Sequence, residues 1–304
     1  MDDGPAPKKK GEVIEGYQIL SLIGRGAASA IYLAQDQKSK RIWALKHVEK
    51  QNPKDQRFLD QAEIEYRISQ ELDHPVMRKI PRLIKKGSLL KVRELYLVME
   101  YLDGQSMERH PPSTFESAIE IFGQVARGLH HMHERGFVHA DMKPNNIVVD
   151  DAGDARVIDL GQSCKIGTVK PRIQGTPDYI APEQVHRKEI TAATDIYNFG
   201  ASIYWVLTRR NIPTALAKGD SLLGSVDASL LKKPDAPIEV NPRVPEKLSK
   251  LIMDCVEAEP TDRPVSMAFV ADRLELIHGQ LVASQRIQPS SKDGVKDSAA
   301  GGGG

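Results

Sequence analysis

The chain changes character near residue 103. Before this point it consists of short β-prone runs, GYQILSLIG, SAIYLAQD, RIWALKHV and ELYLVMEYL, interrupted by one helical stretch. After it, apolar residues recur at helical spacing, and the segment 196–207 is apolar almost all round, which is typical of a helix buried inside a lobe. We therefore predict an α+β fold with a small sheet-rich N-terminal lobe, 17–102, and a larger, mostly helical C-terminal lobe, 103–284.

Two signals bound the first helix of the C-terminal lobe. Ser113 and Glu116 form a predicted capping box, and apolar residues follow at helical spacing from Phe115 to Met132. Gly136 is predicted to stop this helix, since glycine is common just past a helix C-terminus.

The two ends of the chain lack a hydrophobic period. Residues 1–16 are rich in Pro, Lys and Gly, and residues 285–304 include the small, polar stretch PSSKDGVKDSAAGGGG. Such compositions are typical of flexible segments, so we predict a tail at each end.

Charge and cysteine content limit the classes of partner. The chain has 42 basic and 41 acidic residues, and its net charge of +1 gives no indication of a nucleic-acid or membrane-surface partner. Cys164 and Cys255 could pair, but two cysteines make no disulfide framework, and free thiols in a reducing compartment fit better. No apolar run approaches the ~18 residues of a membrane span, and the N-terminus lacks the apolar core of a signal peptide. We therefore expect a soluble, cytoplasmic protein, of undetermined oligomeric state.

Two glycines and a lysine in the N-terminal part suit a phosphate ligand. Gly24 and Gly26 lie at a predicted hairpin turn, where backbone N–H groups can approach phosphates, although glycines there are more often plain turn residues. Lys46 ends the apolar strand IWALK. Glu65 shares the apolar face of the following helix and would need a cation there, so we predict a Lys46–Glu65 pair. Glu63 is the alternative, but it projects from another side of the helix.

The stretch VHADMKPNN, 138–146, gathers side chains suited to chemistry. Asp141, Lys143 and Asn146 supply a carboxylate, an ammonium and an amide, and Asp159 ends the apolar strand that follows. A lone aspartate at such a position is usually a turn or cap residue. Two acids with an asparagine favour a Mg²⁺ site instead, since this ion prefers oxygen ligands.

With these segments in order, the chain resembles the eukaryotic-type (Hanks-type) protein serine/threonine kinase family over about residues 17–278. The matching segments are GRGAASAI, WALK, HADMKPNN, DLG, GTPDYIAPE, DIYNFG and DRP. The resemblance implies the bilobal protein-kinase fold, with a small antiparallel-sheet N-lobe carrying one helix and a larger mostly helical C-lobe. It also implies transfer of the γ-phosphate of Mg-ATP to Ser/Thr hydroxyls of protein substrates. The lack of fused sensor or membrane segments resembles bacterial stand-alone members.

The resemblance implies a role for each matched residue. Asp141 would accept or orient the proton of the substrate hydroxyl, and Lys143 would steady the γ-phosphate. Asn146 and Asp159 would hold Mg²⁺. The ATP-binding residues implied are Ile23, Gly24, Gly26, Ser29, Ile31, Ala44, Lys46, Glu65, Met99, Glu100, Leu102 and Val148.

Within that set, the backbone groups of Glu100 and Leu102 would read the edge of the adenine. Outside it, Asp195 would brace the catalytic loop, 139–146, and Glu183 would pair with Arg263. The pattern of Lys143 together with Thr176 resembles that of the serine/threonine branch of the family. Thr176 is expected to contact the catalytic loop.

Four positions depart from the family pattern. Ser29 stands at the third glycine of the phosphate loop, Leu160 replaces a Phe, and Ser69 falls where an apolar residue often packs behind the helix. Ala140 stands where many members have an Arg that pairs with a phosphorylated residue of the activation segment. The residues before GT, KPRIQ, carry no hydroxyl. We therefore predict activity independent of activation-segment phosphorylation.

Several alternatives remain open from the sequence. Ser163 and Thr168 are candidate autophosphorylation sites. We interpret His130, His131 and His133 as solvated rather than metal-binding, and Cys164 as an ordinary thiol. An ATP-binding pseudokinase scaffold is the alternative function, although no catalytic position is lost. A small-molecule phosphotransferase is a second rival.

Overall fold

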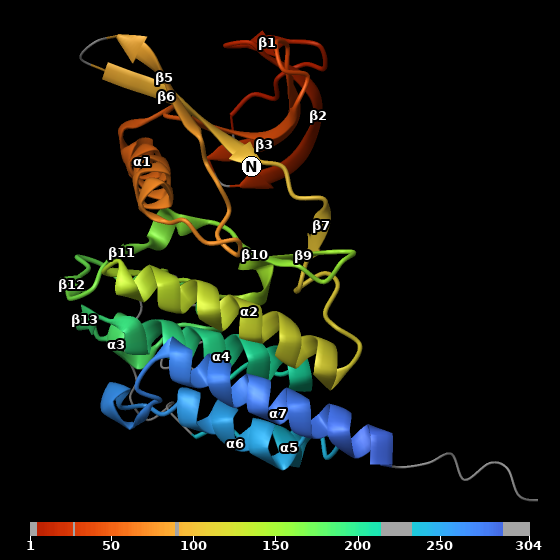
Figure 1. Ribbon diagram of the computed structural model, residues 1–304. Helices are drawn as coiled ribbons and strands as arrows, with labels where there is room; N and C mark the ends of the chain where they lie inside the picture. The colour runs from red at the N-terminus through yellow and green to blue at the C-terminus, as the bar shows by residue number, and fades with distance from the viewer. Residues whose placement is uncertain (1–4, 27, 89–90, 214–232, 288–304) are drawn as a thin grey trace, which may run out of the picture.

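The computed structural model describes residues 5–26, 28–88, 91–213 and 233–287. These residues form two lobes, one above the other in Figure 1, which confirms the predicted α+β class. The N-terminal lobe is a curled, six-stranded antiparallel sheet in the order β1-β2-β3-β4-β6-β5. Its strands are β1 Val13–Ile14, β2 Tyr17–Gly26, β3 Ser29–Asp36, β4 Ile42–Glu49, β5 Arg82–Ser88 and β6 Lys91–Glu100.

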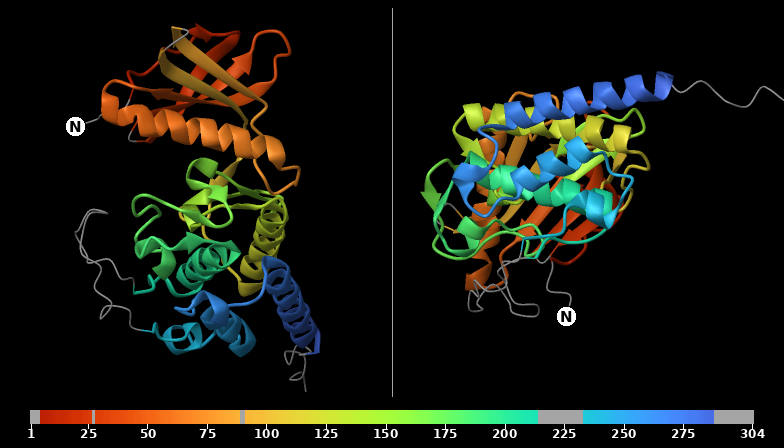
Figure 2. Two further views of the ribbon diagram at one scale, coloured as in Figure 1. Left: turned by 90° about the vertical axis from the view of Figure 1, so that its left-hand side faces the viewer. Right: turned by 90° about the horizontal axis from the view of Figure 1, so that it is seen from below.

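The sheet buries a different set of side chains on each face, as strand alternation requires. On one face, Tyr32 of β3 packs with Ile19 and Tyr96. On the other, Ala44 and Leu97 pack against α1 Gln56–Glu71, the helix of this lobe. Figure 2 shows α1 on the side of the sheet that faces the C-terminal lobe.

The predicted tails are shorter than expected where the structure describes them. Val13 and Ile14 pair with Gln18 and Tyr17, and Ile14 is buried among the core residues of the sheet. At the other end, the last helix continues to Ile287. The remaining parts of the predicted tails, 1–4 and 288–304, lie outside the described residues.

The C-terminal lobe is built around two helices packed in its core. These are α2 Phe115–Glu134 and α4 Ala192–Thr208, whose Phe122 and Phe199 rings meet edge to face at 5.2 Å. Helix α7 runs alongside α2 at the edge of the lobe (Figure 2). The remaining helices are α3 Pro182–Val185, α5 Pro237–Val240, α6 Glu246–Cys255 and α7 Met267–Ile287.

The predicted helix boundaries need one correction. The N-cap of α2 is Thr114 rather than Ser113, because the Thr114 hydroxyl accepts the backbone N–H of Ser117 at 3.1 Å. A hydroxyl at either position offers the same chemistry, and only the backbone angles distinguish them. Past the C-terminus, Gly136 has φ of 78°, the left-handed conformation expected for a glycine there.

Short strands flank the catalytic loop and the segment after it in the C-terminal lobe. A three-stranded sheet in the order β10-β9-β7 lies just below the N-terminal lobe, while β8 pairs with β11 and β12 pairs with β13. The bounds of these strands are β7 Gly104–Ser106, β8 Phe137–Val138, β9 Ile147–Asp150, β10 Ala155–Val157, β11 Cys164–Lys165, β12 Thr168–Val169 and β13 Glu189–Ile190.

None of the helices in the described ranges combines the length and the apolarity that crossing a bilayer requires. Cys164 and Cys255 are free thiols, as expected.

Candidate active site

Lys46 and Glu65 form an ion pair at the wall of the cleft. The Lys46 Nζ lies 2.6 Å from Glu65 Oε2, and the Glu65 side chain is 2% exposed. Burial alone would lower the pKa of Lys46, but the carboxylates of Glu65 and Asp159 more than offset this and raise it. Glu63 instead pairs with Lys85 at the surface, 2.8 Å away. Glu65 is therefore the partner of Lys46, as the position on the helix face predicted.

Ser69 lies on the same face of α1 as Glu65. Ser69 is buried one turn further along α1, and its hydroxyl donates to the carbonyl of Tyr66 at 2.7 Å. The polar group is thus satisfied within its own helix, and no hydrophobic side chain fills this position.

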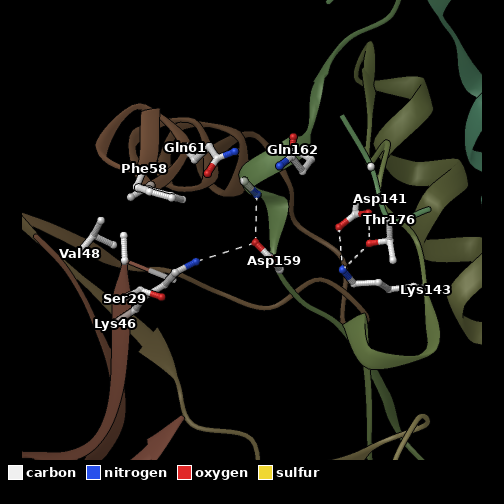
Figure 3. Close-up of a pocket in the computed structure, with 14 residues that line it drawn as sticks. Ser29, Lys46, Val48, Phe58, Gln61, Asp141, Lys143, Asp159, Gln162 and Thr176 are labelled. Carbon is white, nitrogen blue, oxygen red and sulfur yellow. Dashed lines mark hydrogen bonds and ion pairs between the residues drawn. The ribbon is translucent and has the colours of Figure 1, made fainter. Parts of the chain in front are cut away.

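Asp141, Lys143 and Thr176 form a closed triangle of hydrogen bonds. Figure 3 shows the three side chains converging on one side of a cavity of about 330 Å³. Lys143 Nζ donates to Asp141 Oδ2 at 3.0 Å and to the Thr176 hydroxyl at 2.7 Å. The same hydroxyl donates to Asp141 Oδ1 at 2.8 Å. Thr176 therefore links the two charged side chains, which confirms its expected contact with the catalytic loop.

Asp195 holds the backbone of the catalytic loop from below. Its carboxylate accepts the N–H groups of His139 and Ala140, each at 2.8 Å. Ala140 has φ of 60°, a left-handed conformation that costs an alanine about 1–2 kcal/mol. Such a conformation persists where neighbouring bonds offset its cost. The bracing role expected of Asp195 is confirmed.

His133 is a second partner of Asp195 that the sequence did not reveal. Its Nε2 lies 2.8 Å from Asp195 Oδ2, and its side chain is 7% exposed. The expectation that His133 is solvated is therefore wrong, because α2 directs this side chain onto α4 rather than into water. Burial alone would raise the pKa of Asp195, but the bonds from His133 and from Ala140 keep it below its ordinary range.

Asp159 lines this cavity, and both Asp159 and Asn146 line a second cavity that adjoins it. Asp159 has φ of 64°, and its carboxylate accepts the N–H of Gly161 at 3.4 Å. Partial burial raises the pKa of Asp159, but Lys46, His139 and Lys143 outweigh it and keep the group ionised. Asn146 donates its amide nitrogen to the carbonyl of Asp141 at 2.9 Å, which leaves its amide oxygen for a cation. A carboxylate and an amide oxygen are ligands that fit Mg²⁺.

A second cavity, of about 470 Å³, opens between the two lobes beside the first. Most residues of the predicted ATP-binding set line it: Ile23, Gly26, Ser29, Ile31, Lys46, Glu65, Met99, Leu102 and Val148. Three members of the set do not. Ala44 of β4 is fully buried on the face of the sheet toward α1, Gly24 of β2 lies beside Ile31 of β3, and the Glu100 side chain accepts the backbone N–H of Lys79. Arg78, which the sequence did not single out, is a further lining residue.

The sequence profile of the protein kinase domain matches residues 17–274. The chain belongs to the protein kinase family. Among curated proteins, this kinase chain is 29% identical to the serine/threonine-protein kinase PrkC of Bacillus subtilis over 282 residues, which cover 87% of the chain and 42% of PrkC.

It is 28% identical to the serine/threonine-protein kinase PknD of Chlamydia muridarum over 92% of the chain and 33% of PknD. It is also 26% identical to the PknD of Chlamydia pneumoniae over 86% of the chain and 31% of that protein. The chain thus spans less than half the length of the curated relatives that it matches. The bacterial origin of these relatives supports the expected resemblance to bacterial members of the family.

Ala140 and Lys170 make the following contacts in and beside the activation segment of this kinase chain, 159–183. Ala140 is buried against Val138 and Ile190, where it offers no charge. Lys170 donates from its ammonium group to the carbonyl of Gln162, within the same segment. Burial lowers the pKa of Lys170, an effect that Cys164 and Asp141 oppose.

The two candidate autophosphorylation sites in the kinase chain differ in accessibility. Ser163 is 2% exposed, and its hydroxyl donates to the carbonyl of His139 at 3.3 Å. Thr168 is partly exposed in β12, where its hydroxyl donates to the carbonyl of Lys165 at 2.6 Å. Ser163 therefore does not present an acceptor hydroxyl to solvent in this conformation.

Glu183 and Arg263 form the buried bidentate pair that the kinase motifs predicted. Arg263 donates from Nη1 and Nη2 to the two carboxylate oxygens of Glu183, at 2.7 and 2.9 Å. Both side chains are almost fully buried. The pair ties the end of the activation segment to the start of α7, so it supports the kinase fold rather than chemistry.

Within the described part of the chain, no group of three or more His, Cys, Asp or Glu side chains is arranged to hold a metal ion.

Proposed function

We propose that this chain is a protein serine/threonine kinase that transfers the γ-phosphate of Mg-ATP to Ser or Thr hydroxyls of protein substrates. The observation that carries the proposal is the convergence of two sets of charged groups on one cleft. Lys46, paired with Glu65, faces Asp159 at 3.9 Å, and the triangle of Asp141, Lys143 and Thr176 lies alongside.

Each charged or polar residue of the site has its own role in phosphate transfer. Lys46 is the cation positioned for the α- and β-phosphates, and Glu65 fixes its direction. Asn146 and Asp159 would hold Mg²⁺, which would supply positive charge beside the phosphates. Asp141 accepts or orients the proton of the attacking hydroxyl, and Lys143 steadies the γ-phosphate. Such a site works mainly by positioning and by electrostatic stabilisation.

The nucleotide is assigned to the cavity of about 470 Å³ between the lobes, because most of the expected ATP-binding residues line it. The base would lie between Ile31 and Val148, with Met99 at the back and the backbone groups of Glu100 and Leu102 at its edge. Ser29 places a hydroxyl near the phosphates where the family has a third glycine. The named activities of PrkC and of the PknD proteins support a serine/threonine assignment.

We also propose that the activation segment works without a phosphate. A phosphate would need a cationic partner at position 140, and Ala140 supplies none. The anchor from Lys170 to Gln162, together with the pairing of β12 with β13, supports an ordered segment in the unmodified chain.

Transfer of labelled γ-phosphate from Mg-ATP to the protein itself and to a generic basic substrate tests the function. Label on Ser or Thr, identified by phosphoamino-acid analysis, is expected in the unchanged protein and absent in Asp141→Asn and Asp159→Asn. Asp151→Asn, the same change at an exposed turn residue, is the matched control and should retain transfer. ATP binding without any transfer would replace the proposal with an ATP-binding scaffold, and transfer to a metabolite alone would indicate a small-molecule phosphotransferase.

A further inference from the structure

Arg78 places a guanidinium at the carbonyl that is proposed to read the base. Its Nε donates to the backbone oxygen of Glu100 at 3.0 Å. Arg78 also lines the cavity of about 470 Å³ together with Met99 and Lys46. The cavity therefore has a cationic group among its lining residues at the end of β6, where the chain leaves the sheet toward β7 (Figure 1).

The backbone on both sides of Arg78 fixes where this side chain starts. The Arg78 N–H donates to the carbonyl of Val157 in β10 at 3.2 Å, and Val157 in turn donates to Val76 at 2.7 Å. One residue later, the carbonyl of Lys79 accepts the N–H of Glu100 at 2.9 Å. The segment 76–79 thus bridges β10 and the end of β6. Arg78 reaches the Glu100 carbonyl from a backbone that is bonded at both edges.

The charges around Arg78 keep the guanidinium in the cavity. Burial lowers the pKa of Arg78, whereas the carboxylates of Glu65, Glu100 and Asp159 oppose that shift. Arginine nevertheless stays protonated in proteins, so the group remains a cation with five N–H donors. Three carboxylates nearby offset the cost of placing that cation inside the cleft.

We propose that Arg78 relaxes the selectivity of the pocket at position 6 of the purine, so that the chain binds purine nucleoside triphosphates lacking the 6-amino group nearly as well as ATP. This inference rests on the proposed function, in which backbone groups of Glu100 lie at the edge of the base, and it takes the Glu100 carbonyl as the acceptor of the adenine amino group. A carbonyl left unpaired in a buried site costs more than one hydrogen bond contributes on balance. Arg78 keeps the Glu100 carbonyl paired, so a nucleotide without the amino group leaves no unpaired acceptor.

The clean probe is purine riboside 5′-triphosphate, which differs from ATP in lacking the 6-amino group. The dissociation constants of its Mg²⁺ complex and of Mg·ATP are measured by calorimetry on the unchanged protein and on three variants. In the unchanged protein the two constants should agree within about threefold. In Arg78→Met, the emptied carbonyl should make ATP bind about tenfold more tightly than the probe.

Two further variants separate this role from a structural one. Arg78→Lys keeps a cationic donor and should retain the weak preference of the unchanged protein. Lys79→Ala removes the neighbouring, exposed cation and leaves the backbone bonds in place, so the ratio of the two dissociation constants should also be unchanged. If Arg78→Met does not fold, the ratio of the two dissociation constants in the unchanged protein and in Arg78→Lys still tests the proposal.

The outcomes distinguish this inference from the proposed function. One outcome would overturn the role of Arg78 and leave the kinase proposal intact. In that outcome the unchanged protein, Arg78→Lys and Arg78→Met all bind ATP about tenfold more tightly than the probe. Failure of both nucleotides to bind the unchanged protein would overturn the proposed function and this inference with it.

Discussion

The carboxylate of Asp195 accepts the backbone N–H of Ala140 at 2.8 Å while Ala140 has φ of 60°. A left-handed alanine persists only where its surroundings hold it. Here the same carboxylate also accepts bonds from His139 and His133. The residue after Ala140 is Asp141, so this bond network positions the carboxylate that is proposed to orient the substrate hydroxyl.

Asp195→Asn should therefore weaken both the fold and the reaction. The amide nitrogen introduced by this change would face an N–H donor. Breaking a buried, charged network of this kind costs about 2–4 kcal/mol. Urea unfolding measures the loss, and the rate of phosphate transfer should fall in the protein that remains folded. Asp151→Asn at the exposed turn is the control, and equal unfolding midpoints for the two variants would contradict the bracing role.

The Lys46–Glu65 pair offers a comparison with a matched surface pair. Lys46→Met leaves the buried Glu65 carboxylate without its cation, so the free energy of unfolding should fall by about 2–4 kcal/mol. Lys85→Met breaks the exposed Lys85–Glu63 pair, which should cost less than about 1 kcal/mol. Both are read from denaturant unfolding at neutral pH.

Stability and function should then separate in a double variant. Lys46→Met combined with Glu65→Leu removes both charges and should recover most of the lost stability, because a buried pair adds little over an apolar one. It should not recover nucleotide binding. If the double variant is no more stable than Lys46→Met, the loss comes from packing rather than from an unpaired charge.

Lys170 is expected to act as a positioning residue for the activation segment. Lys170→Met removes the bond to the Gln162 carbonyl, so kcat should fall about tenfold while the KM for ATP stays the same. Lys170→Arg keeps a donor and should retain most of kcat. Lys165→Met, at an exposed position of β11, is the matched control. A change in the KM for ATP without a change in kcat would contradict a role in the activation segment.

His47 should make the N-terminal lobe sensitive to acid. Burial lowers the pKa of His47 to about 4, helped by Lys8 and opposed by Glu94. The unfolded chain binds a proton near pH 6.5, so stability is fully present above that pH and is lost as the pH falls toward 4. The loss amounts to up to about 3 kcal/mol. His47→Gln should reduce the change of the free energy of unfolding between pH 6.5 and 4. An unchanged pH dependence in that variant would rule His47 out as the cause.

The lobes and the charged pairs were predictable because their signals are local or repeat along the chain. The face of α1 pointed to Glu65, and the resemblance to the kinase family implied the roles of Asp195 and of the Glu183–Arg263 pair. Helical period cannot show which distant residue a side chain meets. His133 reaches Asp195 across 62 positions, and Arg78 reaches Glu100 across 22.

Other differences arose from packing that a linear pattern does not describe. Ile14 joins the core of the sheet although its neighbours look like a tail. Ala44 of β4 is fully buried among the residues that pack against α1, so it does not line the cavity. Ser163 is buried by the catalytic loop that folds over it. Each depends on contacts between segments brought together only by the completed fold.

The most direct test is the initial rate of phosphate transfer by protein that carries no phosphate. The chain is treated with phosphatase, separated from it, and mixed with Mg-ATP and a Ser/Thr peptide substrate, with Asp141→Asn alongside. We expect transfer at the full rate from the first turnover, with no lag, and none in Asp141→Asn. No transfer by the unchanged protein, or a rate that rises only as label accumulates on the chain itself, would contradict it.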